Sequence, residues 1–109
     1  MVKVLYLVMK NSPGAHETLE ELSKAGFNAT VINTESLHQA LDYYPEEHHF
    51  FNLRQLERME LQESVLCWFL LDAERLEQAK SIIREQTEGF THVKGFMFSQ
   101  PIEDYEGSV

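Results

Sequence analysis

Apolar residues recur along the chain in two similar blocks. In the first, residues 2–9 are almost continuously apolar and rich in Val, Leu and Tyr, which is typical of a strand buried on both faces. Ser12 and Pro13 then suit the N-cap and the first position of an amphipathic helix. Gly26 with Phe27 predicts the end of that helix, and the β-branched residues 28–34 predict a second strand.

The second block runs from Glu63 to Gln100 and repeats this order. Residues 65–71 are apolar without interruption, and Asp72 is placed to cap a helix whose inward face is Leu76, Ala79, Ile82 and Ile83. Gly89 and Phe90 predict the end of this helix, as Gly26 and Phe27 do for the first. A fourth strand is expected around Val93, Lys94, Gly95, Phe96 and Phe98, before Pro101 and an acidic tail.

The repeat predicts one α+β domain of 109 residues with a ferredoxin-like βαββαβ fold. In that arrangement a four-stranded antiparallel sheet carries two helices on one face. The first and third strands are central and the second and fourth lie at the edges. The continuously apolar character of strands one and three agrees with central positions.

Two helices cover only one face of such a sheet, so apolar residues on the other face would form an exposed patch. We therefore expect the open face to be buried in a homo-oligomer. The alternative is that the long connection between the second and third strands folds over it.

That connection, residues 35–62, has no single clear pattern. Ser36 and Asn52 could each begin a short helix, but an extended arm leading into the next strand is equally compatible with the residues. A connection of this length in a small domain is usually functional or disordered. It is also a candidate surface for a protein partner.

Composition limits the function classes. The net charge is −9 and the nine Lys and Arg residues are scattered, which argues against a nucleic-acid partner. No apolar run is long enough for a membrane helix, and the first apolar run is too short for a signal peptide. With one cysteine there is no disulfide framework, so a cytoplasmic location is expected.

The densest group of metal-ligating residue types is Glu46, Glu47, His48 and His49. Imidazoles and carboxylates suit a divalent transition metal, and oligomer symmetry could bring copies of one histidine together. The alternative is a solvated polar loop. Nearby aromatic residues could stack on a ligand or dock a partner, or pack on their own domain; they are Tyr43, Tyr44, Phe50 and Phe51.

The remaining chemistry is sparse. Cys67 and Trp68 are adjacent in a central strand and should point to opposite faces, with Cys67 a core residue because no base accompanies it. The sequence contains no nucleophile elbow, phosphate loop, paired CxxC or HExxH motif. No cofactor is indicated.

The order of elements and several segments resemble the P-II and CutA-like group of small trimeric ferredoxin-like proteins. The segments are Glu63-Ser64-Val65-Leu66, the helix from Ala73, Gly89-Phe90, and the ending Phe98-Ser99-Gln100-Pro101-Ile102-Glu103-Asp104. That group also has a long excursion between its second and third strands. The resemblance implies a cytoplasmic trimer that senses a small ligand between subunits, or a metal-associated protein.

By the same resemblance, a glycine-containing turn before the last strand would hold the ligand. The matching residues are Gly89, His92, Lys94 and Gly95, with Tyr43 and Tyr44 as further candidates. There is no arginine after Arg84, which argues against classical ATP binding. Binding of another small ligand is still compatible with these residues. The alternatives are a CutA-like divalent-metal-binding protein, or a small cofactor-free enzyme with an apolar pocket between helices and sheet.

Overall fold

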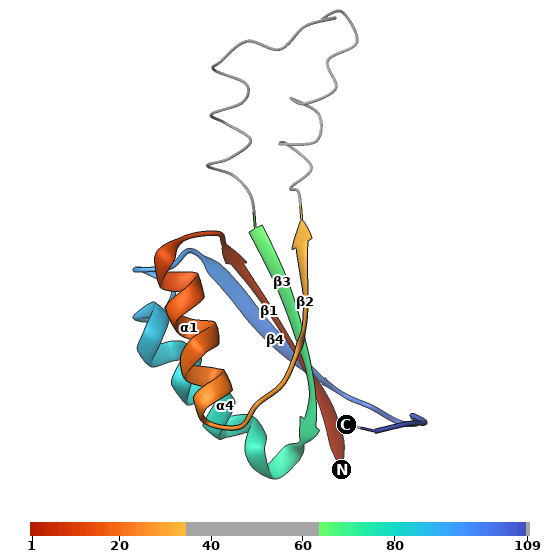
Figure 1. Ribbon diagram of the computed structural model, residues 1–109. Coiled ribbons are helices and arrows are strands. Elements are labelled where there is room, and N and C mark those ends of the chain that lie inside the picture. The colour runs from red at the N-terminus through yellow and green to blue at the C-terminus, as the bar shows by residue number, and fades with distance from the viewer. Residues whose placement is uncertain (35–63, 109) are drawn as a thin grey trace, which may run out of the picture.

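The computed structural model describes residues 1–34 and 64–108. Its elements are β1 (Val2–Lys10), α1 (Pro13–Lys24), β2 (Thr30–Thr34), β3 (Ser64–Asp72), α4 (Ala73–Thr87) and β4 (Gly95–Pro101). The four strands form one antiparallel sheet in the order β2-β3-β1-β4, and both helices lie on one face of it (Figure 1). This is the ferredoxin-like α+β fold that the sequence repeat predicts, with β1 and β3 in the centre.

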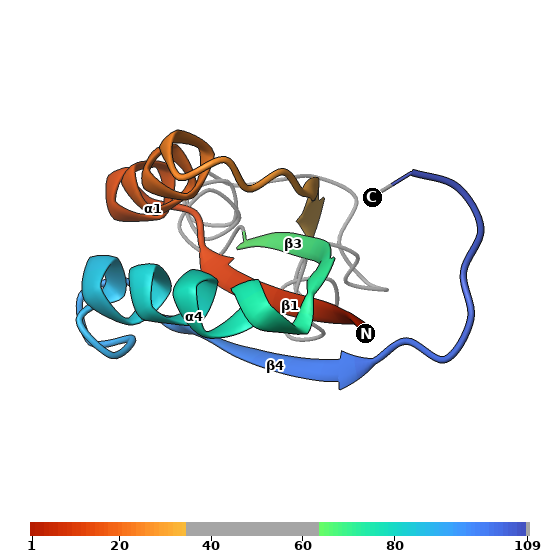
Figure 2. The ribbon, with the colours of Figure 1, turned by 90° about the horizontal axis from the view of Figure 1, so that it is seen from below.

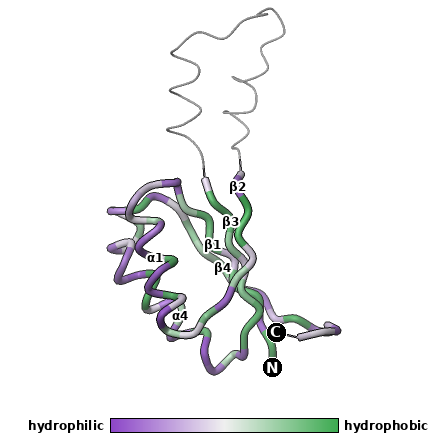
Figure 3. Tube along the Cα trace, in the orientation of Figure 1, coloured by the Kyte–Doolittle hydropathy of each residue, from purple (hydrophilic) through white to green (hydrophobic). Residues whose placement is uncertain are grey.

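The strand registers give each face of the sheet its own set of side chains. Tyr6 of β1 lies opposite Trp68 of β3 and Phe98 of β4. Leu7, one residue further, lies opposite Cys67 and Met97. Because side chains alternate along a strand, the first set shares the open face and the second set faces the helices. Figure 3 shows the resulting apolar character of the central strands β1 and β3.

The core lies between the sheet and the two helices, which Figure 2 shows side by side over one face. Leu5, Leu7 and Met9 of β1 are fully buried there, because their side chains face α1 and α4. The helices contribute the apolar stripe expected from their spacing, and the buried members are Ala15, Leu22, Leu76, Ala79 and Ile83.

The start and end of α1 confirm the sequence prediction. Ser12 is the N-cap, and its hydroxyl oxygen accepts a hydrogen bond from the Ala15 N–H at 3.2 Å. Gly26 has a φ of +89°, which the absence of a side chain permits. Phe27 is buried, with the Arg75 guanidinium 4.0 Å from its ring centre, so the end of α1 is held against α4.

Two details of α4 differ from the prediction. Asp72 occupies the N-cap position, but its side chain makes no capping hydrogen bond. The Ala73 N–H, the first of the helix, donates to the Met1 carbonyl at 2.9 Å, because β1 begins beside the end of β3. At the other end the left-handed conformation starts at Glu88 with a φ of 52°, one residue before the predicted Gly89.

The last strand begins later than predicted, at Gly95 instead of Val93. Val93 lies before the strand and is buried in the core. Within the two described ranges, no helix is long and apolar enough to cross a membrane.

Candidate functional site

The turn between α4 and β4 contains the residues expected to hold a ligand. Glu88, Gly89 and Phe90 all have positive φ angles, of 52°, 66° and 65°. Thr87 is fully buried and fixes this turn: its hydroxyl accepts the Phe90 N–H at 3.1 Å, and its carbonyl accepts the His92 N–H at 3.0 Å. The turn is thus held by defined hydrogen bonds, while Gly89 itself stays exposed with open space around its Cα.

This turn packs against the junction between β1 and α1. The Lys10 N–H donates to the Lys94 carbonyl at 2.8 Å, which continues the β1–β4 pairing by one step. A Cβ placed on Gly14 would lie 3.2 Å from Nε2 of His92, so the imidazole covers the first turn of α1. His92, Lys94 and Lys10 are all exposed, and the fold brings them to one end of the sheet.

Close packing between β4 and β1 requires a glycine at position 95. A Cβ at this position would lie 2.0 Å from the Val8 carbonyl oxygen and 3.0 Å from the Met9 Cα. Only glycine allows the β4 backbone to approach β1 this closely. The glycine that the family resemblance assigned to a ligand is therefore required by the sheet itself.

The long connection leaves and re-enters the sheet at this same end. Thr34 and Lys10 both lie opposite Ser64, the first residue of β3. The other predicted site residues, Tyr43, Tyr44, Glu46, Glu47, His48 and His49, lie outside the described residues. In the part of the chain that is described, no three His, Cys, Asp or Glu residues are grouped as metal ligands would be.

The open face of the sheet carries an aromatic cluster. The Tyr6 ring stacks on Phe98 with centroids 4.7 Å apart and meets Trp68 edge to face at 6.4 Å. Phe96 stacks in turn beside Phe98 at 6.3 Å. Phe96 is 54% exposed and Phe98 48%, so these rings pack against one another and still face solvent.

Apolar side chains extend this cluster across all four strands. Alternation from the paired residues places Ile32, Leu66 and Leu70 on the same face as Trp68. We use "open face" for this surface, which consists of Val4, Tyr6, Val8, Ile32, Leu66, Trp68, Leu70, Phe96 and Phe98. No charged residue lies within it.

Cys67 is a core residue, as predicted. It is fully buried on the helix face of β3, while its neighbour Trp68 is on the open face. Burial raises the pKa of the Cys67 thiol to about 11, so the thiol is protonated at neutral pH. A protonated and inaccessible sulfur cannot serve as a nucleophile.

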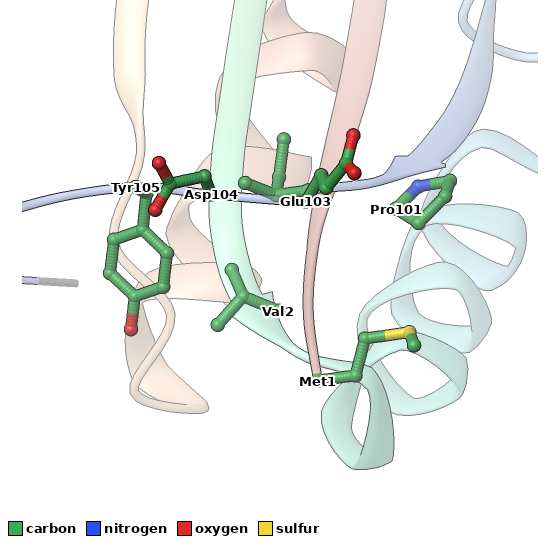
Figure 4. A pocket seen from close by; sticks show the side chains of 7 residues that line it. Met1, Val2, Pro101, Glu103, Asp104 and Tyr105 are labelled. Carbon is green, nitrogen blue, oxygen red and sulfur yellow. The ribbon is translucent and has the colours of Figure 1, made fainter.

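The sequence indicated only an acidic tail after Pro101, and the structure gives this tail a position. The Ile102 N–H donates to the Val2 carbonyl at 3.0 Å, after which the chain leaves the sheet. Figure 4 shows Glu103 and Asp104 passing in front of β1 and β3, on the side away from the helices, with Tyr105 beyond them. Tyr105 and Leu70 line a common pocket, so this tail crosses the open face near the start of β1.

The tail does not close against its own domain. A pocket of 770 Å³ separates it from Met1 and Val2, and Figure 2 shows its wide arc. This pocket lies at the opposite end of the sheet from His92 and Lys94, neither of which lines it.

The space between α1 and the sheet is small. A pocket of 160 Å³ there is lined mainly by apolar residues, among them Leu19, Leu22 and Phe69, with no acidic or basic side chain. Ligand pockets usually have about 300–1,000 Å³.

Comparison with known proteins adds the fold alone. No model of a known protein family and no curated protein matches the sequence. A crystal structure of a functionally unknown protein from Pediococcus pentosaceus is similar, with a TM-score of 0.63 over 98% of this chain and 97% of that chain, at 10% sequence identity. At this identity, the similarity extends to the arrangement of helices and strands and not to function.

Proposed function

We propose that the protein is a P-II-like cytoplasmic sensor that assembles into a homo-oligomer through its open face. A small ligand binds beside the turn from Glu88 to Gly95, at the subunit interface. The apolar, aromatic open face is the observation that supports this function best.

The size of the exposed apolar surface supports assembly. An aromatic side chain presents about 150–250 Å². The exposed fractions of Trp68, Phe96 and Phe98 therefore correspond to roughly 300 Å² of aromatic surface per copy. Leu70 and Ile32, at 37% and 42% exposure, extend it. Apolar patches beyond a few hundred Å² usually mark interaction sites on soluble proteins.

The ligand proposal rests on the charges at one end of the sheet. Lys10, Lys94 and His92 are exposed there next to the N-terminus of α1, which itself attracts anions. Both ends of the connection between β2 and β3 lie at the same end, so a bound ligand could act on that connection. A small anionic ligand such as a nucleotide fits this set of groups.

We expect light scattering after size exclusion to give the full chain a mass of two or more copies. Phe98→Asp should reduce it to a single copy with unchanged far-ultraviolet circular dichroism, because a carboxylate cannot be buried unpaired on an apolar interface. Ser99→Asp is the matched control, since Ser99 is exposed on the same strand but faces the helix side, and it should leave the mass unchanged. A single-copy mass for the unsubstituted chain at micromolar concentration would contradict the assembly.

We expect a cyclic dinucleotide to raise the Tm by about 5 °C at ten times its Kd. Lys94→Ala should weaken that binding about tenfold through loss of a charged contact to phosphate, whereas Lys24→Ala, at the opposite end of α1, should not change it. If neither ATP nor any cyclic dinucleotide changes the Tm, nucleotide sensing is ruled out.

A further inference from the structure

A separate cavity lies at the end of the sheet opposite to His92 and Lys94. Its walls come from the start of β1, the end of β3, the first turn of α4, the turn between α1 and β2, and the tail. Its volume of 310 Å³ is at the lower limit of ordinary ligand pockets and suits a small molecule. Figure 4 shows two of its lining side chains, Val2 and Tyr105, and how Tyr105 projects from the tail.

Arg75 is held in place in the wall of this cavity. Its Nη2 donates to the Ala25 carbonyl at 2.9 Å, and its guanidinium carbon lies 4.0 Å from the centre of the Phe27 ring. A guanidinium has five N–H donors, and the carbonyl takes one of them. None of the ion pairs in the described part of the chain includes Arg75. The cavity is therefore lined by a fixed cation whose remaining donors are open to a ligand.

Asp72 adds the opposite charge to the same cavity. It is exposed and occupies the N-cap position of α4, but its side chain makes no capping hydrogen bond. Among the residues that the structure describes, no ion pair includes it, and it does not pair with Arg75 three residues later. A carboxylate and a guanidinium that line one cavity without meeting each other are suited to a ligand that carries both charges.

The rest of the wall is apolar with one amide. Leu70 is 37% exposed and Tyr105 45%, and Val2 is half-buried beside them. Asn28 accepts the Ala29 N–H at 2.9 Å through its side-chain oxygen, which leaves its NH₂ group as a further donor. The cavity thus combines an apolar surface with groups for one carboxylate and one ammonium.

We infer that this cavity binds an α-amino acid with an apolar side chain. Arg75 receives the ligand's carboxylate, for which the planar guanidinium is well matched, and Asp72 receives its ammonium. The apolar side chain packs against Leu70 and Tyr105. This site goes beyond the proposed function and does not depend on it, since Leu70 is the only residue that the cavity shares with the open face.

Other classes of ligand fit these groups less well. A phosphate ester or dicarboxylate would place its additional negative charge near Asp72 and near the carboxylates of the tail, Glu103 and Asp104. A polyamine would meet the Arg75 guanidinium with a like charge. An uncharged apolar molecule would remove water from both charged groups without replacing their hydrogen bonds, which is costly.

The test is isothermal titration of the full chain with L-leucine. We expect saturable binding with a Kd below about 10 mM. Leucinamide lacks the carboxylate and 4-methylpentanoate lacks the ammonium, and each should bind at least about tenfold more weakly because one charged contact is lost. These comparisons use the unsubstituted chain, so they do not depend on how well a variant folds.

Two variants assign the contacts to their residues. Arg75→Gln and Asp72→Asn should each weaken leucine binding about tenfold or more. Asparagine is as good an N-cap as aspartate, so Asp72→Asn should keep the fold, which circular dichroism checks. Arg84→Gln and Glu74→Gln are the matched controls on the same helix, outside the cavity, and should leave the affinity unchanged.

The outcomes also separate this site from the proposed one. If L-leucine, L-valine and L-methionine all fail to bind, the amino-acid site is overturned. It is likewise overturned if leucinamide or 4-methylpentanoate binds as tightly as L-leucine. Failure of the cyclic dinucleotides would contradict the site at Lys94 and leave this one standing, because the two sites share no residue.

Discussion

Replacing Gly95 by alanine is expected to lower the free energy of unfolding by about 3 kcal/mol or more. The added methyl would lie 2.0 Å from the Val8 carbonyl oxygen, well inside van der Waals contact. The obstacle is backbone rather than a mobile side chain, so the clash can be relieved only by separating β4 from β1. Since small domains have total stabilities of about 5–15 kcal/mol, this is a large fraction. Urea denaturation followed by circular dichroism measures it.

Gly89→Ala is the matched control for this prediction. Nothing lies within 4 Å of a Cβ at Gly89, but its φ of +66° is unfavourable for residues with a side chain. The expected loss is about 1–2 kcal/mol, from backbone conformation alone. Equal losses for the two variants would mean that close approach of β4 to β1 is not the reason for glycine at position 95.

Phe69→Ala is expected to cost about 3–5 kcal/mol of stability, because it leaves a cavity in the core. Phe69 is 2% exposed on the helix face of β3, where it lies opposite Leu5 and faces α1. Surrounding residues on three elements are fixed by their own packing and cannot fill the space. Urea denaturation at low protein concentration, where assembly contributes least, gives the value.

Phe96→Ala removes the same side chain from the open face and serves as the control. Phe96 is 54% exposed, so folding removes only about half of its surface from water. The expected loss for the isolated chain is below about 1.5 kcal/mol. A loss as large as that of Phe69→Ala would mean that the open face is covered within a single copy.

Much of the fold could be predicted because it follows from short-range patterns. The continuous apolar runs at 2–9 and 65–71 indicated central strands, and the structure places β1 and β3 in the centre. Ser12 and Gly26 indicated the limits of α1 correctly, since caps depend on residues within one or two turns.

Most of the errors in the prediction arise where a segment distant in the sequence determines the local structure. The side chain of Asp72 has the right chemistry for a cap but makes no capping hydrogen bond, and the first N–H of α4, that of Ala73, donates to the Met1 carbonyl from the start of the chain. Gly95 was attributed to a ligand because the approach of β1 cannot be recognised from neighbouring residues. The left-handed Glu88 is a local exception, since it lies within the turn that Thr87 holds by hydrogen bonds.

The candidate site divides in the same way. The sequence selected Gly89, His92 and Lys94, but only the fold shows that Lys10 joins them and that the connection between β2 and β3 leaves from the same end. The residues selected in that connection, such as His48 and Tyr43, lie outside the described ranges and stay a prediction.

The sequence by itself determined the class of fold, the two buried strands and the existence of an apolar open face, because the alternation of side chains is a local property of a strand. The tertiary structure alone decided which residues share that face, since the registers between β1, β3 and β4 join segments far apart in the chain. Those registers gather Tyr6, Trp68 and Phe98 into one aromatic cluster. Such a cluster forms only when distant strands pack together, which is why the sequence indicated the surface but not the residues that meet on it.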